Sequence, residues 1–320
     1  MYYPLKFEPI LKKVIWGGNE ICRFKHLNYN ETSIGESWEI SQVPGSVSVV
    51  SNGSLKGHDL SQIIESDPVK LLGKKSFEKY GMKFPLLIKF IDARDDLSIQ
   101  VHPDDKLAKE RHNSFGKTEM WYVIQSEQGA KLISGFSEKI DAEEYEKRIK
   151  DGTIEEVLQQ HEVKEGDVFF IPAGRVHAIG KGLFITEIQQ TSDVTYRLYD
   201  YKRKDANGNE RELHTSLAKD AIDYNLYEDL KVEYEESENE EIRLAGCEYF
   251  ITNKIHLKSD EIFEQQVSVD GKPQSMMITD TIEMERDFSG LDCFRAYICI
   301  SGKGSIDAED NGSVQIHQGE

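Results

Sequence analysis

Residues 166–177, which read Gly-Asp-Val-Phe-Phe-Ile-Pro-Ala-Gly-Arg-Val-His, constrain the fold of this chain more than any other stretch. Gly166 opens an apolar run that is typical of a buried β-strand. Pro172 and Gly174 then turn the chain, so that His177 is predicted to point inward from the next strand. The pattern predicts short strands that enclose a histidine. An ordinary core histidine beside a tight turn is the alternative.

The same spacing resembles the second sequence motif of the cupin superfamily, in which the histidine is a metal ligand. The first cupin motif normally supplies His-x-His and then a glutamate. Here Gln100-Val101-His102 holds the place of the pair, and Glu119 follows after a helical insertion. Residues two apart on a strand face the same side, so Gln100 and His102 can both reach one ion.

These departures from the general cupin pattern narrow the resemblance to one family. Four motifs occur in order along the chain, at residues 97–104 (LSIQVHPD), 116–121 (GKTEMW), 172–177 (PAGRVH) and 189–200 (QQTSDVTYRLYD). Together with Trp16-Gly17-Gly18 and the GESWE stretch at residues 35–39, they resemble type I mannose-6-phosphate isomerases in their short bacterial form.

The resemblance implies one zinc ion per chain, held by Gln100, His102, Glu119 and His177. The donor chemistry agrees, because two imidazoles, a carboxylate and an amide oxygen form a mixed site that suits zinc. Such a set leaves a position for water or substrate, as a catalytic zinc requires. An all-oxygen magnesium site would not need imidazole.

The implied reaction interconverts mannose 6-phosphate and fructose 6-phosphate through a metal-stabilised cis-enediol. Arg197 matches the family's catalytic arginine and would stabilise the developing negative charge. From the residues alone, Arg197 would most simply pair with Asp193 or Asp200. Lys117, Asp193 and a zinc-bound water remain candidates for the general base, and His102 and Asp193 for ring opening.

Two other functional classes are weighed against the isomerase. A metal-dependent cupin oxygenase would need a redox iron with open facial positions, and the four-ligand set argues against it. A non-catalytic sugar-binding cupin regulator would keep the barrel without the chemistry. Arg197 and the full ligand set argue against a regulator.

An anionic substrate needs a local positive pocket here, because the net charge of the chain is −19. Basic residues cluster near the motifs, and Lys89 is counted among the substrate-binding residues. The resemblance implies that Ser98, Lys117 and Arg203 contact the sugar phosphate, with Arg203 standing where some family members carry lysine.

Composition excludes several classes of partner. The acidity argues against nucleic acid, and no run approaches the ~18 apolar residues that a membrane span needs. The N-terminus has no apolar leader region, so we expect a cytoplasmic protein without a membrane partner, either a monomer or a weak homo-oligomer. Four scattered cysteines are expected to stay reduced. They are Cys22, Cys247, Cys293 and Cys299.

An acidic run at residues 233–241 indicates a linker. It separates a catalytic metal-binding domain over residues 1–232 from a second, metal-free cupin-like domain over residues 242–320. A weak internal repeat supports two related domains, because residues 122–129 align with 297–304 and place Phe294 opposite Glu119. The predicted fold is mainly β, with two cupin-type (jelly-roll) barrels and helical insertions in the first.

The repeat also carries an expectation about the C-terminus. Gly166-Asp167 is followed by a buried strand, whereas the matching Gly319-Glu320 is the last pair of the sequence. We therefore expect the second barrel to be C-terminally truncated, with an open strand edge.

Hydrophobic periodicity and capping residues predict the local elements. Helices are expected over residues 59–80, 104–112, 138–161 and 214–225. Strands are expected over residues 84–92, 97–102, 119–125 and 168–172.

Overall fold

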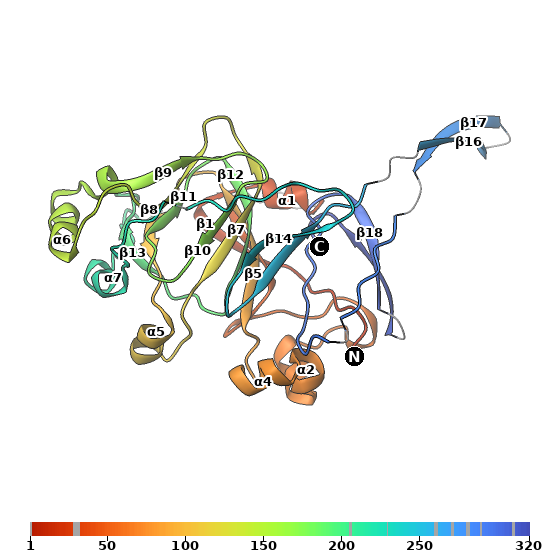
Figure 1. The fold of residues 1–320 in the computed structure, drawn as a ribbon, viewed down its shortest axis with the longest axis horizontal. Coiled ribbons are helices and arrows are strands. Elements are labelled where there is room, and N and C mark those ends of the chain that lie inside the picture. The colour runs from red at the N-terminus through yellow and green to blue at the C-terminus, as the bar shows by residue number, and fades with distance from the viewer. Residues whose placement is uncertain are drawn as a thin grey trace. The chain divides into compact units, whose positions relative to one another are not determined.

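Strands dominate the part of the chain that the computed structural model describes, which is residues 2–27, 33–204, 207–228, 230–258, 262–269, 272–279, 282–288, 290–308 and 311–320. The chain divides into two compact units. The first unit is Met1–Val232 together with Asp292–Glu320, and the second is Glu233–Leu291. Figure 1 traces the chain through its elements.

The first unit is built on a six-stranded antiparallel sheet in the order β1-β2-β5-β12-β7-β10. The two central strands, β5 and β12, are buried along their whole length and pair in unbroken register. This burial explains the largely apolar sequence of β5. In β12 it also places polar side chains in the interior, namely Thr186, Glu187, Gln189 and Gln190. The strands are β1 (Ile10–Gly18), β2 (Ile34–Ile40), β5 (Leu86–Ala93), β7 (Glu119–Ser126), β10 (Val168–Ile171) and β12 (Leu183–Gln190).

A five-stranded sheet in the order β13-β6-β11-β8-β9 faces the first. Both sheets contribute to one apolar core, with Ile91, Trp121 and Ile185 from the first sheet and Leu132 and Ile179 from the second. The mainly β fold predicted from the sequence is confirmed. The strands of the second sheet are β6 (Ile99–Val101), β8 (Lys131–Phe136), β9 (Leu158–Glu162), β11 (His177–Ile179) and β13 (Tyr196–Tyr199).

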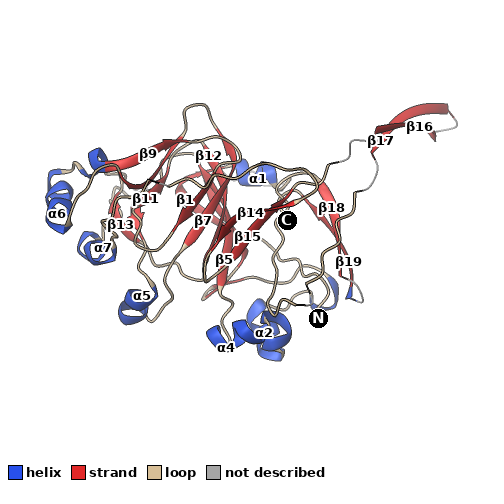
Figure 2. Ribbon diagram, in the orientation of Figure 1, coloured by secondary structure: helices blue, strands red, loops and turns tan. Residues whose placement is uncertain are grey.

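Helices cover the outer face of the five-stranded sheet, as Figure 2 shows in blue. Tyr145 of α6 (Ala142–Asp151) and Ala218 of α7 (Thr215–Ala221) share a core cluster with the outward side chains of that sheet. Asp141 caps α6, and Gly152 ends it at a φ of 70°.

The helix predicted over residues 138–161 is wrong in its second half. After α6, residues Ile154–Val157 form a 3-10 turn (η2), and β9 then pairs with β8. The open edge of β8 offers backbone partners that local periodicity does not reveal. α5 (Asp105–His112) matches its prediction and is capped by Asp104.

The predicted helical stretch at residues 59–80 is three short helices: α2 (Leu60–Ser66), α3 (Pro68–Leu72) and α4 (Lys74–Tyr80). Asp59 forms a capping box with Gln62. Pro68 and Gly73, the latter at a φ of 82°, interrupt the helix. The remaining small elements before β5 are α1 (Glu20–Phe24), β3 (Gln42–Val43), β4 (Ser46–Val47) and η1 (Gly53–Leu55).

Beyond residue 232 the described strands pair two by two. β14 (Glu241–Gly246) pairs with β15 (Ile251–Ile255), and β16 (Ile262–Val269) pairs with β17 (Lys272–Thr279). In the first unit, β18 (Lys303–Ala308) pairs with β19 (Gly312–His317). The predicted division at residues 232 and 242, the second barrel and its truncation stay predictions.

Among the described residues, no helix is both long and apolar enough to cross a membrane. Cys22, Cys247, Cys293 and Cys299 are all free cysteines.

Candidate functional site

Three buried side chains converge between the two sheets of the first unit. His102 follows β6, Glu119 begins β7 and His177 begins β11. Each offers a donor atom, and these atoms lie within 4.8 Å of one another. The Nε2 of His102 lies 3.6 Å from Oε2 of Glu119, and the Nε2 of His177 lies 3.4 Å from Oε1.

Backbone carbonyls orient both imidazoles. The Nδ1 of His102 lies 2.9 Å from the carbonyl oxygen of Val194, and the Nδ1 of His177 lies 2.8 Å from that of Arg175. A carbonyl can only accept, so each Nδ1 carries the proton and each Nε2 presents its lone pair to Glu119. This arrangement fixes the tautomer that a metal-binding histidine needs.

The carboxylate of Glu119 is the unusual member of the group. It is fully buried, and neither of its oxygens accepts a hydrogen bond from a described residue. Burial, and after it the negative charge of Glu187, raises the pKa of Glu119 above its ordinary value. Burial lowers the pKa of His102 far below its ordinary value and that of His177 to about 4. A buried carboxylate between two neutral imidazoles fits a divalent cation.

Gln100 joins these three residues from β6. It pairs across the sheet with His177 on one side and with Arg197 on the other. Its Nε2 lies 3.4 Å from the Nε2 of His177, and rotation of the amide places the oxygen at the same point. The structure therefore brings the four expected ligands together. We call Gln100, His102, Glu119 and His177 the metal cluster.

Lys117 reaches into the metal cluster from the loop before β7. Its Nζ lies 3.1 Å from the Nε2 of His102 and 3.4 Å from Oε2 of Glu119. The side chain is buried. A cation is thus placed beside the point where the expected ligands converge.

A second group of charges lies along β13 and the segment after it. Asp200 is buried and accepts hydrogen bonds from Arg203 and, through both Nε and Nη2, from Arg211. Nearby Arg197 donates from Nη1 to the carbonyl oxygen of Glu212, 2.8 Å away. We call Arg197, Arg203, Arg211 and Asp200 the arginine cluster.

The electrostatics of the arginine cluster are tightly coupled. Burial, and after it the positive charge of Arg211, lowers the pKa of Arg197. Burial alone would raise the pKa of Asp200, but hydrogen bonds from Arg211 and Arg203 hold it below its ordinary value. Arg197 forms no ion pair with Asp193 or Asp200 among the described contacts, so the simple pairing considered from the sequence is absent there.

The remaining expected residues occupy different surroundings. Lys89 is buried on β5 with its Nζ 3.0 Å from Oε1 of Glu187. Ser98 is buried just before β6. Asp193 is exposed in the loop between β12 and β13, next to Val194, whose carbonyl anchors His102.

Sequence reasoning missed Glu187 and Arg211. The sequence did contain a signal for Glu187. It is a charged residue between apolar ones, as Lys89 is, and the two residues pair across β12 and β5. Arg211 lies in no motif, and nothing in the sequence pointed to it.

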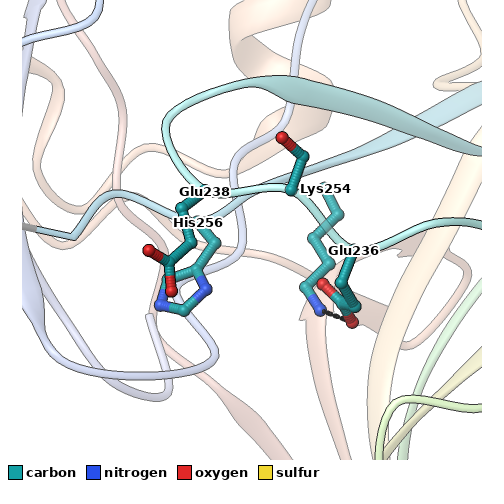
Figure 3. A pocket seen from close by; sticks show the side chains of 5 residues that line it. Glu236, Glu238, Lys254 and His256 are labelled. Atoms are coloured by element: carbon teal, nitrogen blue, oxygen red, sulfur yellow. Dashed lines mark hydrogen bonds and ion pairs between the residues drawn. The ribbon is translucent and has the colours of Figure 1, made fainter.

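The second unit has a surface hollow of about 540 Å³, shown in Figure 3. Glu236, Ser237, Glu238, Lys254 and His256 line it. Lys254 pairs with Glu236, and this hydrogen bond lowers the pKa of the carboxyl. The hollow holds none of the residues singled out from the sequence.

Comparison with known proteins gives consistent matches. The family model described as phosphomannose isomerase type I, catalytic domain, matches residues 5–130. The mannose-6-phosphate isomerase ManA of Bacillus subtilis is 40% identical over 266 residues, 82% of each chain. This chain belongs to the type I phosphomannose isomerase family.

Further members of the family agree. The mannose-6-phosphate isomerase of Streptococcus mutans is 42% identical over 222 residues, which are 69% of this chain and 68% of that protein. The crystal structure of the mannose 6-phosphate isomerase from Bacillus subtilis superposes with a TM-score of 0.72 at 33% identity, covering 86% of this chain and 91% of that one. The resemblance drawn from the four motifs is confirmed, and neither the oxygenase nor the regulator is favoured.

Proposed function

We propose that this protein is an aldose–ketose isomerase that interconverts mannose 6-phosphate and fructose 6-phosphate at the metal cluster. The observation that carries the proposal is the buried Glu119 carboxylate between two oriented, neutral imidazoles. The family membership supports the choice of substrates, because the relatives described above are named for mannose 6-phosphate.

Gln100, His102, Glu119 and His177 would hold the metal, which we propose to be a single zinc ion. Two imidazole nitrogens, a carboxylate and an amide oxygen favour zinc over magnesium. A bound divalent metal supplies Lewis-acid stabilisation for negative charge on the substrate oxygens.

Proton transfer between C1 and C2 needs a base within the site. Of the candidates, Lys117 is buried in contact with His102 and beside Glu119, whereas Asp193 is exposed. We therefore favour Lys117 for the transfer. The Nδ1 of His102 is engaged with the carbonyl oxygen of Val194 and its Nε2 would bind the metal, which favours Asp193 over His102 for ring opening.

Arg197 would stabilise the charge of the enediol. It pairs in register with Gln100, and directly opposed residues of an antiparallel pair project to the same face of the sheet. Its guanidinium therefore belongs to the side of the sheet that carries the metal cluster. A fixed cation at this place acts on charge that develops in the transition state.

The sugar phosphate would be held by Ser98, Lys117 and Arg203, with the arginine cluster providing a positive local field. Three guanidinium groups and one carboxylate leave two positive charges there. This excess is informative in a chain of net charge −19. Guanidinium forks suit phosphate oxygens.

We further propose the wider setting expected from the sequence. The first two facing sheets form a cupin-type barrel, and residues 242–320 form a second, metal-free one. The protein acts in the cytoplasm as a monomer or weak homo-oligomer. Sedimentation and a structure of the full chain with its substrate would test these points.

The decisive experiment incubates purified protein with mannose 6-phosphate and assays fructose 6-phosphate, with and without chelator. Activity that chelation abolishes and zinc restores is expected. Absence of fructose 6-phosphate from a zinc-loaded, folded sample would overturn the proposed function. Activity restored by another divalent ion but not by zinc would overturn the zinc assignment alone.

A further inference from the structure

A row of buried charges crosses the inner face of the six-stranded sheet beside the metal cluster. Lys89 lies at its centre, with its Nζ 3.0 Å from Oε1 of Glu187 on β12 and 3.7 Å from Oε2 of Glu36 on β2. Lys89 and Glu187 are directly opposed in register. Ile91 and Ile185, two positions along each strand, belong to the shared core, so the charges point inward with them.

Indole groups close both ends of the row. Trp121 donates from Nε1 to Oε2 of Glu187 at 2.8 Å, and Trp38 donates from Nε1 to Oε2 of Glu36 at 2.6 Å. The ring of Trp121 also lies edge-on to His177, with centroids 5.4 Å apart. We call Glu36, Lys89 and Glu187, with the indoles of Trp38 and Trp121, the charge row. It connects β2 to a proposed metal ligand.

The balance of charge explains why Lys89 is needed. Inside the barrel, the carboxylates of Glu36, Glu119 and Glu187 face the ammonium groups of Lys89 and Lys117. Three negative and two positive groups leave one negative charge, which a divalent cation at the metal cluster converts to one positive charge. Without Lys89, the negative excess at the site would be two.

Without Lys89, the Glu187 carboxylate would need another cation as its partner. Lys117 is close enough to act electrostatically on Glu187, and Glu187 acts in turn on Glu119. A buried carboxylate that loses its partner is strongly unfavourable, so Glu187 would turn toward Lys117 or toward a bound metal. Both are needed by the substrate in the proposed site.

We propose that Lys89 is a positioning residue that holds Glu187 and Glu36 in ion pairs and so leaves Lys117 and the metal cluster free for the sugar phosphate. Lys89 itself contacts no phosphate, which revises the substrate-binding role first expected for it. The inference rests on the proposed function. It predicts that removing the charge of Glu187 restores the turnover that is lost when Lys89 is replaced.

The test is a four-membered cycle of the zinc-loaded protein: the wild type, Lys89→Met, Glu187→Gln and the double variant. Methionine fills the space of the lysine stem, and glutamine still accepts the hydrogen bond from Trp121. Lys89→Met should lower kcat by about 10- to 100-fold, the loss typical of groups that support a metal site. The double variant should regain kcat to within about threefold of Glu187→Gln, because removing both partners of a buried pair is close to neutral. Its KM for mannose 6-phosphate should stay within about twofold of the wild-type value.

Lys25→Met is the matched control. Lys25 pairs with Glu39 at 2.8 Å, with side chains only 6% and 14% exposed, and its Nζ lies over the outward-facing ring of Phe90. The pair is as deeply buried as the charge row but stands on the opposite face of the same sheet. This variant should melt at a lower temperature while its kcat and zinc content stay unchanged.

Three outcomes would overturn the proposal. A KM raised about tenfold or more in the double variant would make Lys89 a phosphate contact. A Glu187→Gln variant as inactive as Lys89→Met would place Glu187 on the substrate. A double variant as impaired as Lys89→Met would show that the two residues do not act as a pair.

The experiment separates this inference from the proposed function. If the wild type produced no fructose 6-phosphate, the proposed function would be wrong, but melting temperatures would still report whether Glu187→Gln rescues Lys89→Met. If Lys89→Met failed to fold, the KM of the double variant would decide the matter alone.

Discussion

The metal cluster and the arginine cluster are joined where Arg197 pairs with Gln100, and they satisfy their charges in opposite ways. In the metal cluster, the Glu119 carboxylate is buried without a hydrogen bond from any described residue. In the arginine cluster, Asp200 accepts from two guanidinium groups, and Arg197 donates to the carbonyl oxygen of Glu212.

This difference separates two kinds of binding. The metal cluster is oriented but electrostatically incomplete, so a cation should bind tightly and its loss should stop the chemistry. The arginine cluster is held in shape by its own contacts and carries a positive excess. It should attract and orient an anion without depending on one for its structure.

The largest effect is expected from removing the metal. Chelation, or the His177→Ala substitution, should lower kcat by about 10³-fold, since Lewis-acid stabilisation contributes several kcal/mol and about 1.4 kcal/mol is tenfold. Metal content and turnover measured on the same samples check this. His161→Ala is the matched control, because His161 lies on β9 of the same sheet outside the cluster. Full activity in a metal-free sample would show that the chemistry does not depend on a cation at the metal cluster.

The next effect concerns Arg197. Arg197→Ala should reduce kcat by about 10²-fold, the loss typical of one electrostatic stabiliser, with zinc content and melting temperature preserved. Steady-state kinetics with mannose 6-phosphate provide the measurement. A rise in KM at unchanged kcat would instead make Arg197 a binding residue and move it wholly into the phosphate site.

A third prediction concerns the pH dependence of metal binding at the metal cluster. In the metal-free protein, burial raises the pKa of the Glu119 carboxyl above its ordinary value of 4.5. Between pH 4.5 and the raised pKa, a metal ion must therefore displace the proton of this carboxyl in order to bind. Metal affinity should therefore rise with pH there, by about tenfold per unit, and level off above the raised pKa.

The histidines should contribute nothing to this proton release in the neutral range, since the pKa of His177 is already about 4 and that of His102 is far below its ordinary value. Calorimetry in buffers with different ionisation enthalpies should count about one proton released per metal at the acidic end of that range. A count of zero throughout would show that Glu119 is ionised before the metal arrives.

The smallest effect is expected from Arg211→Lys. Lysine keeps the charge but loses the two-nitrogen fork on Asp200. KM for mannose 6-phosphate should rise about two- to fivefold at unchanged kcat, which is less than 1 kcal/mol. Arg148→Lys serves as the control, because Arg148 makes exposed ion pairs on α6. An unchanged KM would leave Arg211 with a structural role only.

Sequence motifs predicted the side chains of the metal cluster because ligand chemistry restricts which residue types can serve. Hydrophobic patterning predicted the buried strand β5 for a similar reason, since burial on both faces favours apolar residues. The motifs could not predict the ion pairs of Lys89, because a lysine near a motif looks the same in sequence whether it faces a phosphate or two carboxylates. The partner carboxylate on β12 lies 98 positions away in sequence (187 minus 89), and only strand pairing brings the two together.

The sequence did not predict strand β9, for a related reason. Residues 158–162 carry no strong period of their own, and the edge of β8 decides their conformation. Similarly, Pro68 and Gly73 are recognisable in the sequence as residues that interrupt a helix. The bounds of the three short helices depend in addition on which residues cap each segment.

The backbone carbonyls of Val194 and Arg175 give the site an unusual kind of robustness. Any residue at these two positions supplies the same oxygen, so exchanging their side chains leaves the imidazole anchors in place. The orientation of the two imidazoles therefore depends on the path of the backbone and not on which side chains stand at these two positions. Random point substitutions would pass over these anchors in a screen. Only an insertion, a deletion or a proline that shifts the two loops would reveal them.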